Sequence, residues 1–475
     1  MKKLTQYIAL LFVIITLQSC QTDDENLVPS NLEVPDFVWK GMNLYYLWQQ
    51  DVPDLDDDRF ENQSDLNSYL EANNDPVALF QHLRVSPEID RFSVIYSDYR
   101  ILEGVLSGTT KNHGVDFGLN YQPGSSTDIF GWVRYILPNS DASTKNIERG
   151  DIFYAVNGTP LTVSNYQNLL GADTYTLNLA DYVDGEIVPN GESVTLTKSV
   201  YSENPVLLKT VIEAGDSKIG YLMYNGFYPA YEQQLNAAFG EFASQNITDL
   251  VLDLRYNSGG SIATSTKLAS MITGQFTGQL FAKEQWNTKL QEYYESENPE
   301  NLRNNFTSSL GNAPVNHLNL TTVYVLTSRS TASASELVIN GLAPYINVVQ
   351  IGDFTIGKNV GSITLYDSPT FGRNGRNPNH FYAMQPIVLK VVNRDGFGDY
   401  QQNGLAPDYL LLENLANLGV LGSETEPLLS TAIGQITGNG RMLKQNPSRS
   451  FRHFKDLKSL KDIQNQMYRE SLPAR

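Results

Sequence analysis

The stretch SRSTASASELVINGLAPYINVVQIGDFTIGK, residues 328–358, decides the interpretation of this 475-residue chain. Its polar corner SRSTASAS follows an apolar segment, TVYVL at 322–326, and leads into a helix with an apolar face. Ser333 lies in that corner between two alanines, and Lys358 follows the next predicted strand. This arrangement suggests a serine nucleophile with a lysine general base. The alternative is a capping box, in which Ser333 and Glu336 satisfy each other's free N–H groups. The flanking alanines and the later lysine favour the nucleophile.

A lysine base requires a lowered pKa, because a free lysine with a pKa near about 10.4 is protonated at neutral pH. Burial among apolar residues such as Phe354 and Ile356 would lower the pKa of Lys358, whereas an ionised Glu336 beside it would raise this pKa. We therefore expect Glu336 to position its neighbours through hydrogen bonds rather than to form an ion pair with Lys358.

A second motif, LVLDLRYNSGG at 250–260, reads as a buried strand that stops at a glycine pair. A helix is predicted from about residue 262, so Gly259 and Gly260 lie near a helix N-terminus, where N–H groups can hold an anion. A tight turn with positive φ is the structural alternative, and it is compatible with an oxyanion role.

The first nineteen residues read as a signal peptide: two lysines precede an apolar run at 7–17 that is too short to span a bilayer. This run leads to LQSC, which resembles a bacterial lipoprotein signal that ends at Cys20; the alternative is a signal peptide with an incidental cysteine. We expect lipid attachment at Cys20, a tether over 20–35, and a position in the cell envelope at the outer membrane, either periplasmic or surface-exposed. Cys20 is the only cysteine, so disulfides and cysteine catalysis are excluded.

Patterning divides the remainder into four parts. Helical spacing predicts a small helical domain at 36–101, and short alternating runs between turn residues predict a β domain at 102–201. An α/β core follows at 202–425, and a tail at 426–475. Within the tail, residues 441–475 hold nine Lys or Arg against three Asp or Glu, and apolar residues are spaced as in an amphipathic helix. A solvated helix is expected there; docking on a membrane surface or on the acidic body is the alternative.

Composition limits the partners and cofactors. The 52 acidic residues outnumber the 34 basic ones, which argues against nucleic acid. The five histidines show neither triad nor metal-ligand spacing, and no phosphate-binding or dinucleotide fingerprint is present. We therefore expect no metal and no cofactor.

Two segments of the β domain resemble a PDZ domain of the bacterial protease type, GVDFGL at 114–119 and IERGDIFYAVNG at 147–158. The resemblance implies that a peptide adds as an extra strand to a sheet edge, with its carboxylate bound by backbone N–H groups. The alternative is another small β-barrel in which Asn157–Gly158 is a hairpin turn. The peptide-binding residues implied are Val115, Asp116, Phe117, Gly118 and Leu119.

Three motifs, DLRYNSGG at 253–260, STASASE at 330–336 and GDFTIGK at 352–358, resemble the C-terminal processing, or tail-specific, serine peptidases. That family implies a crotonase-like (ClpP/crotonase) α/β peptidase core behind the helical and PDZ-like domains. It also implies roles for five residues: Ser333 is the nucleophile, Lys358 is the base, and the N–H of Ala334 with that of Gly259 or Gly260 forms the oxyanion hole.

The chain departs from the family beyond the lysine. Many members have a glutamine four residues after it, where Ser362 stands here, and Asn359 replaces a glycine. Either Ser362 or Glu336 is then left to orient the lysine.

The predicted function is a lipid-anchored serine endopeptidase that captures flexible C-terminal protein segments and cleaves them with a Ser/Lys dyad. A catalytically silent peptide-binding lipoprotein on the same scaffold is the alternative. A crotonase-like enzyme acting on a small acyl substrate is a third hypothesis, against which the PDZ-like domain argues.

Overall fold

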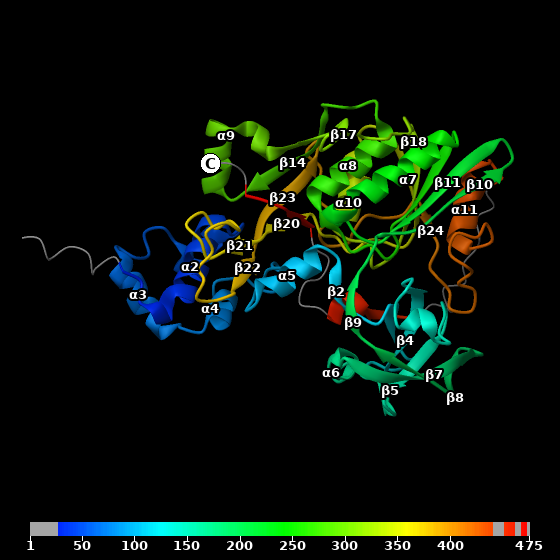
Figure 1. Cartoon of the computed structure of the whole chain (residues 1–475), viewed down its shortest axis with the longest axis horizontal. Helices are drawn as coiled ribbons and strands as arrows, with labels where there is room; N and C mark the ends of the chain where they lie inside the picture. Colours follow the sequence, from blue (N-terminus) through cyan, green and yellow to red (C-terminus); the bar gives the residue numbers. More distant parts are fainter. Residues whose placement is uncertain (1–26, 440–450, 461–466, 473–475) are drawn as a thin grey trace, which may run out of the picture.

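The computed structural model describes residues 27–439, 451–460 and 467–472 (Figure 1). The predicted signal peptide and Cys20 lie outside the described residues. Within the described ranges, no helix is both long enough and apolar enough to cross a membrane.

The chain begins with a group of short helices, drawn in blue in Figure 1. Asn62 and Asp75 accept hydrogen bonds from the N–H groups of Asp65 and Ala78, which caps two of these helices. Helix α2 starts at Glu33, so the helical part begins before the predicted end of the tether at residue 35. Its buried side chains share one apolar core with the α/β body. The elements are η2 (Ser30–Leu32), α2 (Glu33–Tyr45), η3 (Gln49–Asp51), η4 (Pro53–Leu55), α3 (Gln63–Ala72) and α4 (Pro76–His82).

A small sheet attaches this helical part to the body. Strand β1 (Val94–Tyr96) pairs antiparallel with β22 (Ala383–Gln385), which in turn pairs with β21 (Leu365–Tyr366). Helix α5 (Tyr99–Leu106) then leads toward the next domain.

The region after α5 is rich in strands, as predicted, and is called the β domain below. Strands β2 (Thr109–Asn112) and β9 (Ser199–Ser202) pair at its base and connect it to the body. Its antiparallel sheet has the order β25-β3-β4-β5-β7-β8, with β6 beside β5. The elements are β3 (Val115–Tyr121), β4 (Ile129–Ile136), η5 (Ala142–Thr144), β5 (Ile152–Val156), β6 (Thr159–Pro160), α6 (Tyr166–Gly171), β7 (Thr174–Val183) and β8 (Glu186–Thr197).

The main sheet of the body has the order β10-β11-β12-β18-β19-β24, and every neighbouring pair except β10 and β11 is parallel. Helices α7, α8 and α10 contribute to the apolar core on one face, and α11 packs into a second core on the other. Parallel strands end at the same edge of a sheet, so the turns after β12, β18 and β19 meet there. The elements are β10 (Val206–Ala214), β11 (Ser217–Tyr224), η6 (Pro229–Tyr231), α7 (Glu232–Ser244), β12 (Asp249–Asp253), α8 (Ile262–Thr273), β18 (Thr322–Thr327), α10 (Ala334–Leu342), β19 (Asn347–Gly352), β24 (Tyr409–Leu410) and α11 (Pro427–Ile436).

A second sheet of the body has the order β13-β26-β20-β23-β14-β15. Its strands are β13 (Gly260–Ser261), β26 (Met467–Arg469), β20 (Val360–Ile363), β23 (Ile387–Asn393), β14 (Leu280–Trp286) and β15 (Arg303–Asn305). The connection between β14 and β18 holds α9 (Thr288–Glu297), η7 (Pro299–Leu302), β16 (Ser309–Leu310) and β17 (Ala313–Pro314).

The prediction of a solvated helix in the tail is wrong for the described residues. Strand β25 (His453–Asp456) joins the β domain, η9 (Leu457–Leu460) follows, and β26 joins the second sheet of the body. Phe451, Phe454 and Leu457 bury apolar surface against other elements, which stabilises the extended form over a free helix. Helix α11 packs on the main sheet although it lies inside the predicted tail.

Candidate active site

Ser333 lies where the sequence places it, between β18 and α10. Its backbone has φ 66° and ψ −116°, a left-handed conformation that costs a residue with a side chain about 1–3 kcal/mol. The residue is fully buried, and Oγ has no hydrogen-bond partner within the described part of the chain. The capping-box arrangement of Ser333 and Glu336 is also present at this corner. It leaves Oγ without a regular hydrogen bond, so it is compatible with a nucleophile at Ser333.

Lys358 is fully buried between β19 and β20, and Nζ also lacks a hydrogen-bond partner among the described residues. Nζ lies 4.3 Å from the centre of the Phe92 ring. Burial lowers the pKa of Lys358 to about 7, although the carboxylate of Asp90 opposes the shift. The amine is therefore available in its neutral, basic form near neutral pH.

The residues around this amine include some that the sequence analysis did not identify. Phe92 and Asp90 belong to the N-terminal part of the chain, and no local pattern points from them to Lys358. Phe354, which was expected to shield the amine, instead has the guanidinium of Arg329 5.0 Å from its ring centre. A pocket of about 400 Å³ borders Lys358 and Phe92 and also includes Trp48.

Glu336 joins the two candidate catalytic residues. One carboxylate oxygen accepts the N–H of Ser333 at 2.6 Å and the N–H of Lys358 at 2.9 Å. The other oxygen accepts the N–H of Gly357 and the hydroxyl of Thr355. Burial raises the pKa of Glu336 above its ordinary value, and these hydrogen bonds make the rise smaller. No ion pair links Glu336 to Lys358 in the described structure, so its contacts are the positioning hydrogen bonds that were expected.

Of the expected oxyanion donors, Ala334 directly follows Ser333, and the turn of Gly259 and Gly260 is linked to the same corner through Asn257. The N–H of Ala334 is the first of α10 and has no acceptor inside the helix. Gly259 and Gly260 have φ of 109° and 141°, and a Cβ at Gly260 would lie 2.4 Å from the carbonyl oxygen of Phe227. Gly259 donates its N–H to Oδ1 of Asn257 at 2.9 Å, so this donor is engaged in the present conformation.

Asn257 connects the glycine turn to the nucleophile corner. Its carbonyl accepts the N–H of Ala332 at 3.1 Å and the hydroxyl of Ser335 at 3.0 Å. Its side chain also donates to the carbonyl of Tyr224 at 2.8 Å. Asn257 belongs to the motif DLRYNSGG, but no local pattern in the sequence predicts this role for it.

Ser362 and Asn359 have other partners. Ser362 lies in β20 and donates its hydroxyl to the carbonyl of Met467 in β26 at 3.2 Å. The amide of Asn359 bonds to the carbonyl of Gly398 and accepts from Gln401. Glu336, rather than Ser362, holds the backbone of Lys358.

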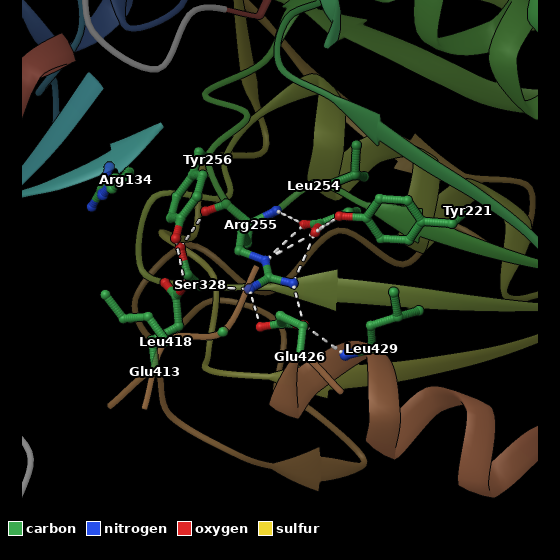
Figure 2. A network of polar contacts seen from close by, with 12 residues as sticks. Arg134, Tyr221, Leu254, Arg255, Tyr256, Ser328, Glu413, Leu418, Glu426 and Leu429 are labelled. Atoms are coloured by element: carbon green, nitrogen blue, oxygen red, sulfur yellow. Dashed lines mark hydrogen bonds and ion pairs between the residues drawn. The ribbon is translucent and has the colours of Figure 1, made fainter. Parts of the chain in front are cut away.

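A network of buried charges surrounds Arg255, which belongs to the same motif as the glycine turn (Figure 2). Arg255 is fully buried and pairs with Asp253 and Glu426, and it reaches Glu413 at 3.3 Å. Arg149 of the β domain binds Glu413 at 2.9 Å. Burial opposes ionisation of Glu413, but the two arginines lower its pKa to about 2. The network therefore ties the β domain to the turn that carries Gly259.

The predicted peptide-binding residues Val115 to Leu119 all lie in β3. One edge of β3 pairs with β4, and the other pairs with β25 from the tail. In the described part of the chain, no group of three side chains is arranged to hold a metal ion.

Comparison with known proteins places this geometry in a family. A model of peptidase family S41 matches residues 218–410, and a model of the peptidase S41 N-terminal domain matches residues 33–94, together more than half of the chain. The chain belongs to peptidase family S41. It therefore belongs to a family of serine-type peptidases.

Relatives and solved structures agree with this assignment. The chain is 23% identical over 343 residues to a carboxyl-terminal-processing protease of Picosynechococcus, which covers 71% of this chain and 73% of that protein. A crystal structure of a Bacteroides fragilis protein described as an S41 protease is 27% identical, with a TM-score of 0.65, covering 85% of this chain and 98% of that one. The photosystem II D1 C-terminal processing protease shares the fold, with 18% identity, a TM-score of 0.51, and coverage of 88% of this chain and 100% of that one.

Proposed function

We propose that this S41 peptidase is a serine endopeptidase that cleaves flexible C-terminal segments of proteins with a Ser333/Lys358 dyad. One observation carries the proposal: a single oxygen of Glu336 holds the N–H groups of both residues, and both side chains are buried with uncommitted polar ends.

The chemistry follows from these groups. Neutral Lys358 takes the proton of the Ser333 hydroxyl while Oγ attacks the peptide carbonyl carbon. The resulting oxyanion is bound by the N–H of Ala334 and by a donor from the glycine turn, each contributing about 3 kcal/mol in the transition state. The lysine then protonates the leaving amine, and it activates a water molecule that hydrolyses the ester on Ser333.

Substrate capture and location are part of the same proposal. The edge of β3 would bind the substrate chain as an added strand, as in a PDZ domain. A lipid on Cys20 would hold the enzyme at the outer membrane, where its substrates would be proteins with flexible ends.

The test is proteolysis of an unfolded model protein by the chain carrying Cys20→Ser. We expect Ser333→Ala and Lys358→Met each to lower the rate by about a thousandfold or more. The control is Ser244→Ala on the exposed face of α7, which should leave the rate unchanged. Cleavage that survives both substitutions would refute the dyad.

The alternative, a silent peptide-binding protein, is favoured by the engaged N–H of Gly259 and by Ser362 in the place of a glutamine. It predicts no cleavage by the parent chain, and equal binding of a flexible peptide by the parent and by Ser333→Ala.

A further inference from the structure

Part of the tail occupies the strand edge to which a peptide would bind. Strand β25 pairs antiparallel with β3, with His453 opposite Asn120 and Asp456 opposite Gly118. The N–H of Tyr121 also donates to the carbonyl of Arg452 at 2.9 Å. Because β4 takes the other edge of β3, an external peptide cannot pair with β3 while β25 is in place.

Side chains of this segment also fill the adjoining surface of the β domain. The Phe454 ring lies 5.2 Å from the rings of both Tyr121 in β3 and Tyr166 in α6. Leu457 packs against the apolar core of the same domain. The segment therefore lies against both β3 and α6, with apolar side chains as its anchors.

The same segment also contacts the corner that holds Ser333 and the turn that holds Gly259. Ser330, three residues before the nucleophile, donates its hydroxyl to Asp456 at 2.8 Å and accepts from Arg134 at 2.9 Å. The Lys458 amine donates to the carbonyl of Tyr256, next to Asn257, at 2.7 Å.

A second piece of the tail lies in the body beside the dyad. Strand β26 runs between β13 and β20, with Met467 opposite Gly260 and Tyr468 opposite Ser362. Met467 is fully buried. Gly260 belongs to the glycine turn, and β20 begins two residues after Lys358. Strand β26 therefore lies between the strand that begins at Gly260 and the strand that follows Lys358.

We propose that the tail is an intramolecular inhibitor that occupies two strand positions of the substrate. Residues 451–458 occupy the edge of β3, and residues 467–469 occupy the position between β13 and β20. The inference rests on the proposed function, and it names the occupant that a flexible protein end must displace. A tethered competitor acts at a high effective concentration, so the resting enzyme has low activity and accepts substrates that compete for β3.

A reversible disulfide tests the occupancy in the full chain. Asn120→Cys with His453→Cys, in a Cys20→Ser background, places two thiols opposite each other on β3 and β25. Oxidation should lower kcat/KM for an unfolded protein at least about tenfold, and reduction should restore it. The matched control is Thr176→Cys with Thr195→Cys, an opposed pair on β7 and β8, which should show no redox effect. An oxidised tail pair that cleaves at its reduced rate would overturn the proposal.

A binding measurement separates this inference from the proposed function. In a Ser333→Ala background, Phe451→Ala with Phe454→Ala should loosen the tail, so a fluorescent peptide FRHFKDLKSL should bind at least about fivefold more tightly than to Ser333→Ala alone. Phe381→Ala, at an exposed ring on another surface, is the control and should leave binding unchanged. Tighter binding, together with no cleavage by the chain that keeps Ser333, would refute the peptidase and support the tail contact. Unchanged binding would refute the tail contact, whether or not the chain that keeps Ser333 cleaves.

Discussion

Replacing Lys358 with methionine should stabilise the protein, and the gain should depend on pH. Burial lowers the pKa of this amine from 10.5 to about 7, which corresponds to a cost of about 5 kcal/mol when the amine would otherwise be charged. Methionine fills a similar volume without a charge. The substitution therefore removes the proposed catalytic base and relieves the cost of burying a charge.

The sign follows from proton binding. Between pH 7 and pH 10.5 the unfolded chain holds a proton on Lys358 that the folded chain lacks, so the stability of the parent rises with pH in this window. Below about pH 7 the full cost is present. The advantage of Lys358→Met should be about 5 kcal/mol at pH 6 and about 2 kcal/mol at pH 9.

Urea unfolding at several pH values, followed by circular dichroism, measures this difference. Lys218→Met, at a partly exposed position at the start of β11, is the control and should change the free energy of unfolding by less than about 0.5 kcal/mol at each pH. An advantage for Lys358→Met that is independent of pH, or a loss of stability at pH 6, would refute the reasoning.

Three further outcomes are expected. The log of kcat should rise with pH and level off above about pH 7, because the base acts only when neutral; a profile that falls across this range would contradict the role of Lys358. Glu336→Gln should destabilise the fold by about 2–3 kcal/mol and lower kcat, since an amide cannot accept all four hydrogen bonds; thermal unfolding and kinetics measure both effects. Arg149→Met should cost about 3 kcal/mol by leaving Glu413 with fewer partners, and a double-mutant cycle with Glu413→Gln should show strong coupling; additive effects would exclude the link.

The sequence predicted the parts of the site that depend on local order. A strand pattern, a corner of small residues and a helix pattern were enough to place Ser333, and the motif spacing placed Lys358 on the following segment. The left-handed backbone of Ser333 could not be predicted, because the surrounding fold imposes it against the local preference.

Contacts between segments that are distant in the sequence could not be predicted from local patterns. Phe92 and Asp90 approach Lys358 only because the N-terminal helices share a core with the body. A positioning role was predicted for Glu336. Its hydrogen bond with the N–H of Lys358 forms only because the fold brings the segment after β19 next to α10.

The tail shows why a pattern can mislead. Apolar residues at 451, 454 and 457 suit a helix, yet they also suit a strand that ends in a 3-10 turn. The edge of β3 favours the strand, because its backbone groups would lack protein partners if residues 453–456 formed a helix in solvent. That edge is far away in the sequence, so only the fold reveals the competition.

The most direct measurement is labelling with a fluorophosphonate reagent, which reacts with activated serine nucleophiles, followed by mass spectrometry of the labelled peptides. The dyad predicts a single label on Ser333, and a labelling rate that falls by about a hundredfold or more in Lys358→Met. Labelling at another serine, or an equal rate in both proteins, would contradict the assignment of Ser333 and Lys358 as nucleophile and base.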